Sequence, residues 1–337
     1  MKRSVLKAIR FTIFLAIGLI LLYFAFRGVS LEDLLSSLRM ADFKWVAFAL
    51  SFAFVGYVSR AYRWKLLIKP LNYDPPLKNV FYALMIGYTA NFAFPRIGEI
   101  SRCGTLRRSD KIPLDSLLGT VIIERAIDLV VLLLVLIVVF FSKIGFFGAF
   151  FRNNIFDPFL NKIVPYFQLS VLYWVIFIAV LALLIFIVWF LNRKFSGNPV
   201  IKKVKELIRG VVAGLKTIVQ MKDRWTFIFH TLLIWLMYFL MTYVLVFALP
   251  ATSHLSPLDG MFLLVIGGLG MSAPVQGGIG AFHWIVALGL SLYGVPRTDA
   301  VAYATLSHES QAIFAVLLGG LSFVMLMIQN RKALQNK

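Results

Sequence analysis

The 337-residue sequence is poor in cysteine and in acidic residues. Cys103 is the single cysteine, which excludes an internal disulfide and any metal cluster built from cysteines. Only 15 Asp and Glu stand against 34 Lys and Arg, which gives a formal net charge of +19. In a soluble chain this charge would indicate nucleic acid, but here the basic residues lie in short loops beside long apolar runs. We therefore expect no nucleic-acid partner and interpret the charge as a positive-inside pattern reinforced by anionic lipid.

Motifs of enzymes and of cofactor-binding folds are also missing. His308-Glu309 lacks the second histidine of a zinc-protease helix, and neither a paired Asp motif nor a serine nucleophile elbow is present. The spacing of Gly268-x-Gly270-x-x-Ala273 matches a dinucleotide fingerprint, but no βαβ unit surrounds it. We expect no catalytic residue, no metal and no cofactor.

Long apolar runs dominate what is present. Hydrophobic residues make up 60% of the chain, and several runs approach the roughly 20 residues that span a bilayer. The expected fold class is an all-α polytopic membrane protein with a single integral membrane domain, residues 1–337. Six full spans are predicted, at about 11–26, 43–64, 114–141, 169–191, 225–249 and 300–328. The first is interpreted as an uncleaved span, because no small-residue cleavage site follows it.

The stretch from Gly87 to Lys111 interrupts this pattern. Charged side chains at membrane depth usually face a protein interior or a wet cavity. A proline followed closely by glycine breaks a helix, and broken backbone at that depth must be satisfied by protein or water. The stretch is therefore predicted to be a functional site, with the polar or helix-breaking residues Asn91, Pro95, Arg96, Gly98, Glu99 and Arg102.

Charge counting decides how this stretch is placed. If residues 77–94 crossed the membrane, the basic residues up to Lys111 and the nine Lys and Arg of 193–224 would lie outside. That contradicts the positive-inside rule, so we predict a re-entrant hairpin that turns at 95–98 and returns by about Arg108. The same reasoning makes residues 258–293, with their glycine-rich break at 273–280, a second re-entrant hairpin that enters from the opposite side.

Basic residues also set the expected orientation. Arg60, Arg63, Lys65 and Lys69 mark a cytoplasmic end of the second span, and the last span ends in Arg331 and Lys332. Both termini are therefore expected in the cytoplasm. The segment 198–223 mixes apolar and basic residues, as an interfacial helix does.

The order of elements predicts an inverted repeat. The halves, about 8–150 and 165–330, each contain two spans, a hairpin and a third span, and they begin on opposite sides. Opposed broken helices that meet near the midplane are typical of transporters.

Anion binding is the chemistry that such breaks favour. Half-helices that start near Ile97 and Gly280 would point their N-terminal N–H groups into the membrane, where they bind phosphate well. We expect acidic groups at Glu99 and in the fourth span to hold the arginines or to exchange protons. In that span Glu124, Arg125 and Asp128 can share one side of the helix and partly neutralise one another.

Less specific interpretations stay open at each position. The charges near Arg96 can form a structural ion-pair knot, His283 can be a packed histidine, and His308-Glu309 can be a buried relay. Three functions also remain: a lipid transporter with a central polar cavity, a lipid-modifying transferase with Glu99 or Glu124 as base, and a non-transporting partner of a lipid enzyme.

The motifs resemble a known family. Asn91-x-x-x-Pro95-Arg96-x-Gly98-Glu99-x-x-Arg102, Ile123-Glu124-Arg125-x-x-Asp128 and the break from Pro274 to Gly280 are similar to the lysylphosphatidylglycerol synthase transmembrane-region family, a flippase-like, UPF0104-type family. The resemblance covers about residues 10–327. It implies movement of an anionic or phosphate-bearing lipid, of phospholipid or polyprenyl-phosphate type, between leaflets of a bacterial or archaeal cytoplasmic membrane. Relatives accompany envelope lipid pathways, so a lipid biosynthesis enzyme is a possible partner.

Two departures limit the resemblance. Synthases of the family carry a soluble aminoacyl-transfer domain after the membrane part, whereas this sequence stops at Lys337, so aminoacylation is not expected. Many relatives have glutamate where His283 stands, which affects the expected charge of the substrate. The predicted substrate-binding residues are Asn91, Pro95, Arg96, Gly98, Glu99, Arg102, Glu124, Arg125, Asp128, Gln276, Gly277, Gly278, His283, His308 and Glu309.

Overall fold

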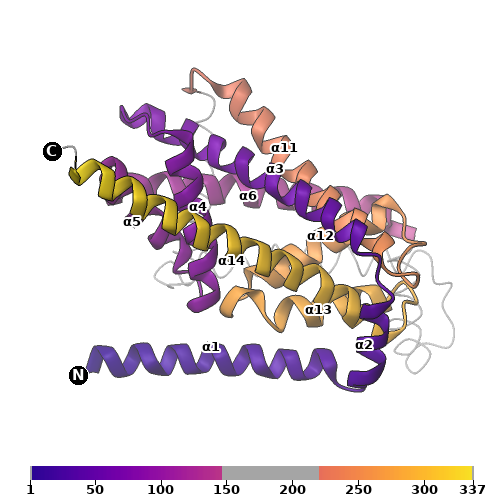
Figure 1. The fold of residues 1–337 in the computed structure, drawn as a ribbon. Coiled ribbons are helices and arrows are strands. Elements are labelled where there is room, and N and C mark those ends of the chain that lie inside the picture. The colour runs from indigo at the N-terminus through magenta and orange to yellow at the C-terminus, as the bar shows by residue number, and fades with distance from the viewer. Residues whose placement is uncertain (1, 146–219, 336–337) are drawn as a thin grey trace, which may run out of the picture. The chain divides into compact units, whose positions relative to one another are not determined.

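The computed structural model describes residues 2–145 and 220–335, and it forms two compact units (Figure 1). The first unit comprises Met1–Arg125 and Thr217–Lys337, and the second comprises Ala126–Lys216. In chain order the helices are α1 (Lys2–Phe26), α2 (Leu31–Arg39), α3 (Phe43–Ile68), η1 (Lys69–Leu71), α4 (Leu77–Ala93), α5 (Gly98–Asp110), α6 (Leu114–Ser142), α11 (Arg224–Val244), η3 (Leu245–Ala248), α12 (Pro257–Ser272), η4 (Gln276–Gly278), α13 (Ala281–Ser291) and α14 (Arg297–Gln335).

The predicted all-α class is confirmed, since the regular elements within the described ranges are helices and none is a strand. In the part of the chain that the structure describes, three helices are long and apolar enough to cross a membrane: Phe43–Leu71, Arg224–Ala248 and Arg297–Gln329. The α1–α2 pair, bent by 79°, is a fourth candidate. The total of six spans stays a prediction, because the span at 169–191 lies outside the described residues, as does most of the segment 198–223.

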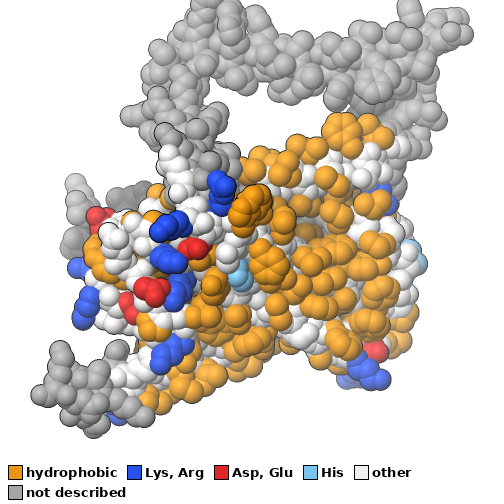
Figure 2. Space-filling view, turned by 90° about the horizontal axis from the view of Figure 1, so that it is seen from above, with side chains coloured by type: hydrophobic (Ala, Val, Ile, Leu, Met, Phe, Trp, Pro, Cys, Tyr) orange, Lys and Arg blue, Asp and Glu red, His pale blue; other side chains and the backbone are white. Residues whose placement is uncertain are grey.

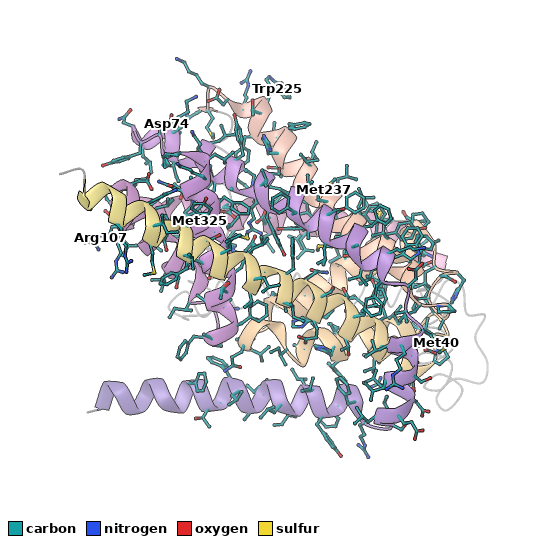
Figure 3. All side chains as sticks on the ribbon, viewed as in Figure 1. Met40, Asp74, Arg107, Trp225, Met237 and Met325 are labelled. Carbon is teal, nitrogen blue, oxygen red and sulfur yellow. The ribbon has the colours of Figure 1, made fainter. Side chains whose placement is uncertain are left out.

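The helices α3 and α11 pack against each other as an antiparallel pair (Figure 1). At one end, Lys69 after α3 donates a hydrogen bond of 2.8 Å to Asp223 before α11. At the other end, the N–H of Asp42 donates to the carbonyl of Ala248 at 2.9 Å. Figure 3 labels Met40 near this second end. Because a hydrogen bond joins the two helices at each end, α3 and α11 run antiparallel, and the other elements of the first unit are described relative to this pair.

The helices α4 and α5 form the first helical hairpin around a break at residues 94–97. Asn79 near the start of α4 donates to Asp110 at the end of α5 at 3.0 Å, so the two outer ends lie together. Between them Gly87 and Gly98 let the backbones touch, because a Cβ on Gly98 would overlap the Gly87 carbonyl. The 13 residues of α5 extend only about 20 Å, less than the roughly 30 Å of a hydrocarbon core.

The helices α12 and α13 form the second hairpin, and their break contains η4. The ring of Phe262 on α12 lies 5.6 Å from that of Tyr293, which follows α13, so the outer ends again lie together. Gly280 at the break has a φ of 81° and packs against Gly18 of α1. A Cβ on Gly280 would overlap the Gly18 carbonyl, so this contact requires glycine.

The two hairpins open toward opposite ends of the first unit. Hairpin α4–α5 begins after the end of α3, and hairpin α12–α13 begins after the end of the antiparallel α11. Their breaks meet where Arg96 donates to the carbonyl of Ser272 at 3.3 Å and where the ring of Phe92 covers Gly277. Re-entry into a membrane stays a prediction, as do the single domain of residues 1–337 and the half-repeats at 8–150 and 165–330.

Each hairpin is held in its own cluster of buried apolar side chains. One cluster joins α3, α4 and α5 and includes Trp64 and Leu84, which are fully buried. The other joins η3, α12, α13 and α14 and includes Leu290 and Tyr303, at most 1% exposed. Part of each hairpin is therefore packed inside protein, where broken helices can be satisfied, whereas Phe94, Arg96 and Ile97 of the first break are exposed.

The outward surfaces of the long helices are apolar. Figure 2 shows a face dominated by hydrophobic side chains, with most basic and acidic ones at the left and a smaller charged group at the lower right. Side chains more than 50% exposed include Phe48, Phe229, Leu232, Ile313, Leu317 and Phe323. Apolar surface this extensive is unusual in soluble proteins and is what a bilayer would cover.

Candidate functional site

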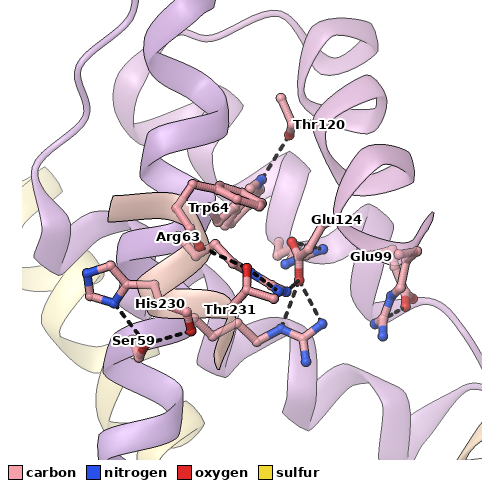
Figure 4. A network of polar contacts seen from close by, with 12 residues as sticks. Ser59, Arg63, Trp64, Glu99, Thr120, Glu124, His230 and Thr231 are labelled. Carbon is pink, nitrogen blue, oxygen red and sulfur yellow. Dashed lines mark hydrogen bonds and ion pairs between the residues drawn. The ribbon is translucent and has the colours of Figure 1, made fainter. Parts of the chain in front are cut away.

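A first group of polar side chains surrounds the carboxylate of Glu124 on α6 (Figure 4). Arg60 reaches Oε1 with Nε at 2.8 Å and Nη2 at 2.7 Å. Nη2 of Arg102 lies 2.9 Å from Oε2, and Nη2 of Arg63 lies 3.7 Å from Oε1. None of these four side chains is more than 7% exposed. Three guanidinium groups from α3 and α5 thus share one interior carboxylate.

Aromatic and hydroxyl groups position the arginines. The guanidinium of Arg102 lies 4.4 Å from the ring centre of Trp64, whose indole N–H donates to Thr120 at 2.9 Å. Nη1 of Arg60 donates to the hydroxyl of Tyr238 at 2.7 Å. Nη1 of Arg102 is buried and has no hydrogen-bond partner among the described residues. An anion beside Arg102 would supply the acceptor that this N–H lacks.

Arg60 and Arg63 are buried, a position that the sequence analysis did not predict. Both were expected to mark a cytoplasmic end of a span at 43–64, and this orientation stays a prediction; α3 continues to Ile68, and both side chains turn inward. Only Lys65 and Lys69 beyond them are exposed to solvent, at 25% and 58%. The available signal was the i, i+3 spacing, which places both arginines on one face of the last part of α3.

The charged residues of α6 also reach neighbouring helices. Glu124, Arg125 and Asp128 were expected to share one side of the helix and partly neutralise one another, and this stays a prediction. Arg125 lies 2.6 Å from Glu99 of α5, and the two side chains are 47% and 25% exposed. Asp128 lies one turn beyond Glu124, in the second unit. The expectation that Glu99 and Glu124 hold Arg125 and Arg102 agrees with these contacts.

The break of the first hairpin is built by the residues that the sequence singled out. The side-chain oxygen of Asn91 accepts a hydrogen bond of 2.7 Å from the N–H of Gly98, the first residue of α5. Pro95 lies in the turn between the helices, and Arg96 follows with a φ of 60°. The exposed Arg96 guanidinium reaches the carbonyl of Ser272 at the end of α12, where the helix dipole is negative. The N–H of Gly98, at the helix start that was expected to bind an anion, is therefore already hydrogen-bonded to Asn91.

The break of the second hairpin places Gln276, Gly277 and Gly278 in the interior. Gly277 and Gly278 have φ values of 57° and 81°, which favour glycine. The amide nitrogen of Gln276 is buried without a hydrogen-bond partner in the described part of the chain. The ring of Phe92 lies against Gly277 and 6.5 Å from that of His308, which links the two hairpins.

A second polar group lies beside this break. Nε2 of His308 lies 2.8 Å from the carbonyl oxygen of Gly277, and its Nδ1 lies 2.9 Å from Oε1 of Glu309. Nε2 of His283 on α13 lies 3.5 Å from the same carboxylate oxygen. Both histidine side chains are 2% exposed, whereas that of Glu309 is 45% exposed. The sequence indicated these residues separately, and the fold brings them together.

The predicted residues thus form two groups. Glu99, Arg102, Glu124 and Arg125 form the first, and His283, His308, Glu309 and Gly277 form the second. The hairpin breaks connect them through Arg96 and Phe92. A central polar cavity between the groups stays a prediction.

Comparisons with known proteins agree on one family. The lysylphosphatidylglycerol synthase TM region family matches residues 11–319. The chain is also similar to the UPF0104 membrane protein MJ1595 of Methanocaldococcus jannaschii, with 21% identity over 349 residues, which covers 95% of this chain and 96% of that protein. No solved structure matches the chain significantly.

Proposed function

Because the chain belongs to the lysylphosphatidylglycerol synthase transmembrane-region family, which links it to membrane lipid metabolism, we propose that it moves a phosphate-bearing lipid between leaflets. The head group, of phospholipid or polyprenyl-phosphate type, passes through the protein while the tails remain in the bilayer. The lipid is moved without being chemically changed. The observation that carries this proposal is the buried guanidinium of Arg102, which pairs with Glu124 and keeps an N–H that has no acceptor among the described residues.

A series of charged side chains, which become less exposed from the hairpin tip inward, gives the lipid head group a path into the protein. Arg96 at the tip of the first hairpin is exposed, and Arg125 and Glu99 are 47% and 25% exposed. One turn further along α5, Arg102 is only 3% exposed and faces the fully buried Glu124. A phosphate can exchange partners along these guanidinium groups, which bind it with charge-assisted hydrogen bonds.

The opposed hairpins support access from both sides. They open toward opposite ends of the α3–α11 pair, and their breaks touch through Arg96 and Ser272. Transporters with this plan expose a central site alternately to the two sides by moving one repeat against the other. In the proposal, loss and restoration of the Arg96 contact accompany that movement.

The proposed localisation is a cytoplasmic membrane with both termini in the cytoplasm. Basic residues Lys65, Lys69, Arg107 and Arg108 follow or end α3 and α5, and Figure 1 draws both chain termini at that end of the unit. The positive-inside rule assigns such an end to the cytoplasm. An envelope lipid biosynthesis enzyme that supplies the lipid is the partner we propose.

Reconstituted vesicles test the proposal. Purified protein is placed in liposomes with fluorescent phosphatidylglycerol, and an impermeant quencher reports how fast the inner-leaflet lipid reaches the outside. The protein should accelerate this movement over protein-free liposomes. Loss of a hydrogen bond to a charged group costs about 1.5–3 kcal/mol, so Arg102→Gln should slow transport by about tenfold or more. Arg107→Gln, an exposed arginine on the same helix, should leave the rate unchanged.

Three outcomes oppose the proposal. Equal rates for wild type and liposomes without protein would contradict transport, and a chemically altered lipid found by mass spectrometry would indicate a transferase instead. Arg102→Gln with the wild-type rate would remove Arg102 from the path. The Arg102→Lys variant, which keeps the charge, and the thermal midpoint of each variant separate a lost site from a lost fold.

A further inference from the structure

We propose that His283, His308 and Glu309 form a binding site for a divalent transition metal ion of the Zn²⁺ type. One ligand atom from each of the three residues lies within 4.8 Å of the others. Nε2 of His283 and Nδ1 of His308 both lie close to Oε1 of Glu309, so we take these three as the ligand atoms. This inference is independent of the proposed lipid transport. The residues belong to α13 and α14 and lie apart from the group around Glu124.

The tautomer of His308 is the first argument. Its Nε2 lies 2.8 Å from the carbonyl oxygen of Gly277, and a carbonyl can only accept, so Nε2 carries the hydrogen. In the neutral ring Nδ1 then presents a lone pair, and it faces a carboxylate oxygen of Glu309 at 2.9 Å. Two acceptors at this distance repel unless a cation lies between them. A hydrogen bond from the remote ring nitrogen to a backbone carbonyl is also the usual arrangement of a metal-bound histidine.

The second argument is the convergence of His283 from another helix. Its Nε2 lies 3.5 Å from the same oxygen of Glu309. Ligands about 2.1 Å from a tetrahedral Zn²⁺ lie about 3.4 Å apart, so this separation fits shared coordination. The 2.9 Å between His308 and Glu309 is shorter, and rotation of the half-exposed Glu309 side chain can widen it. His283 is 2% exposed, and its other ring nitrogen has no hydrogen-bond partner among the described residues.

The donor set selects the metal. Two imidazoles and one carboxylate suit Zn²⁺ and its first-row neighbours, whereas Mg²⁺ and Ca²⁺ prefer oxygen ligands throughout. The rings of Phe26, Phe92 and Phe282 lie within about 6.5 Å of the histidine rings and shield them with apolar surface. Glu309 is 45% exposed, so a fourth ligand, water or a phosphate oxygen, can approach from its side.

The location gives the metal a structural consequence. His283 lies at the start of α13, Gly277 lies in the break, and His308 lies on α14. A bound ion would therefore connect the broken tip of the second hairpin to α14. Because metal binds the folded state, it should stabilise the protein, and the gain should rise with the logarithm of metal concentration once that concentration exceeds the dissociation constant.

Metal binding by the whole chain tests the proposal. Protein purified in detergent through a tag without histidine is stripped with a chelator and then incubated with Zn²⁺ or Co²⁺. Elemental analysis should find one Zn²⁺ per chain, and Co²⁺ should produce visible d–d absorption bands. His283→Ala and Glu309→Gln should reduce both signals to background. His254→Ala, an exposed histidine in a turn, should behave as wild type.

The shift of the melting midpoint on addition of Zn²⁺ tests metal binding even in variants that are less stable than the wild type. Zn²⁺ should raise the melting midpoint of the wild type and of His254→Ala, and it should leave that of Glu309→Gln unchanged. If the wild-type protein takes up no more Zn²⁺ than His283→Ala, the proposal is wrong. In that case a proton is the cation that His308 and Glu309 share.

Discussion

Nη2 of Arg102 lies 2.9 Å from Oε2 of Glu124, and neither side chain is more than 3% exposed. The two residues come from different helices, α5 and α6, so the ion pair fixes the second helix of the first hairpin to the start of the following helix. Burial of charge requires such pairing, since the desolvation cost of an isolated ion is several kcal/mol.

Glu124→Gln should destabilise the protein strongly, because it leaves buried guanidinium groups around a neutral amide. Breaking a buried pair by removing one partner costs about 3–5 kcal/mol. Glu99→Gln is the matched control, since the Glu99 pair with Arg125 is partly exposed and contributes about 0–1 kcal/mol. Thermal midpoints of the two variants in detergent measure both losses of stability. A Glu124→Gln variant as stable as Glu99→Gln would contradict the buried pairing.

Gly98→Ala should prevent the first hairpin from closing. A Cβ at this position would overlap the Gly87 carbonyl and lie 2.6 Å from the Asn91 amide nitrogen, and a backbone carbonyl cannot move aside. Gly104→Ala on the same helix meets nothing within 4 Å and should be neutral or stabilising by up to about 1 kcal/mol. Gly104→Ala should give a higher yield of monodisperse protein and a higher thermal midpoint than Gly98→Ala. The reverse ranking would show that the helices do not touch there.

Asn91→Ala should weaken the break without abolishing the fold. It removes the oxygen that accepts from the Gly98 N–H, and an unsatisfied buried donor costs about 1–3 kcal/mol. Asn91→Asp keeps an acceptor beside the positive end of α5 and should retain more of the stability. Denaturation curves of the two variants check this. Equal losses of stability in Asn91→Ala and Asn91→Asp would mean that Asn91 stabilises the break by something other than the oxygen that accepts from the Gly98 N–H.

Single cysteines at Arg108 and Pro296 should report opposite sides of the membrane. Both positions are exposed, and they follow hairpins that open in opposite directions. The background is Cys103→Ala, in which the buried native thiol is removed. An impermeant thiol reagent applied to intact cells and to inverted vesicles measures the side of each. Labelling of both positions from the same side would refute two opposed re-entrant hairpins.

The sequence by itself determined the class of the protein and the position of the hairpin breaks. Both depend on local chemistry: apolar runs of spanning length, and proline and glycine beside charge at membrane depth. The residues Asn91 and Gly98 were identified because a polar side chain and a helix-breaking glycine are unusual within an apolar run, which is a property of a short segment.

Only the tertiary structure decided which side chains meet. Arg60 and Arg63 looked like topology markers, because a charge near a helix end can face the interface or an interior carboxylate with the same local sequence. His308-Glu309 on α14 lacked a second histidine nearby in sequence, and His283 lies beside the pair from α13 of the second hairpin. The reason is physical: contacts between helices depend on the face that each presents and on the register in which they pack, and neither is fixed within one helix.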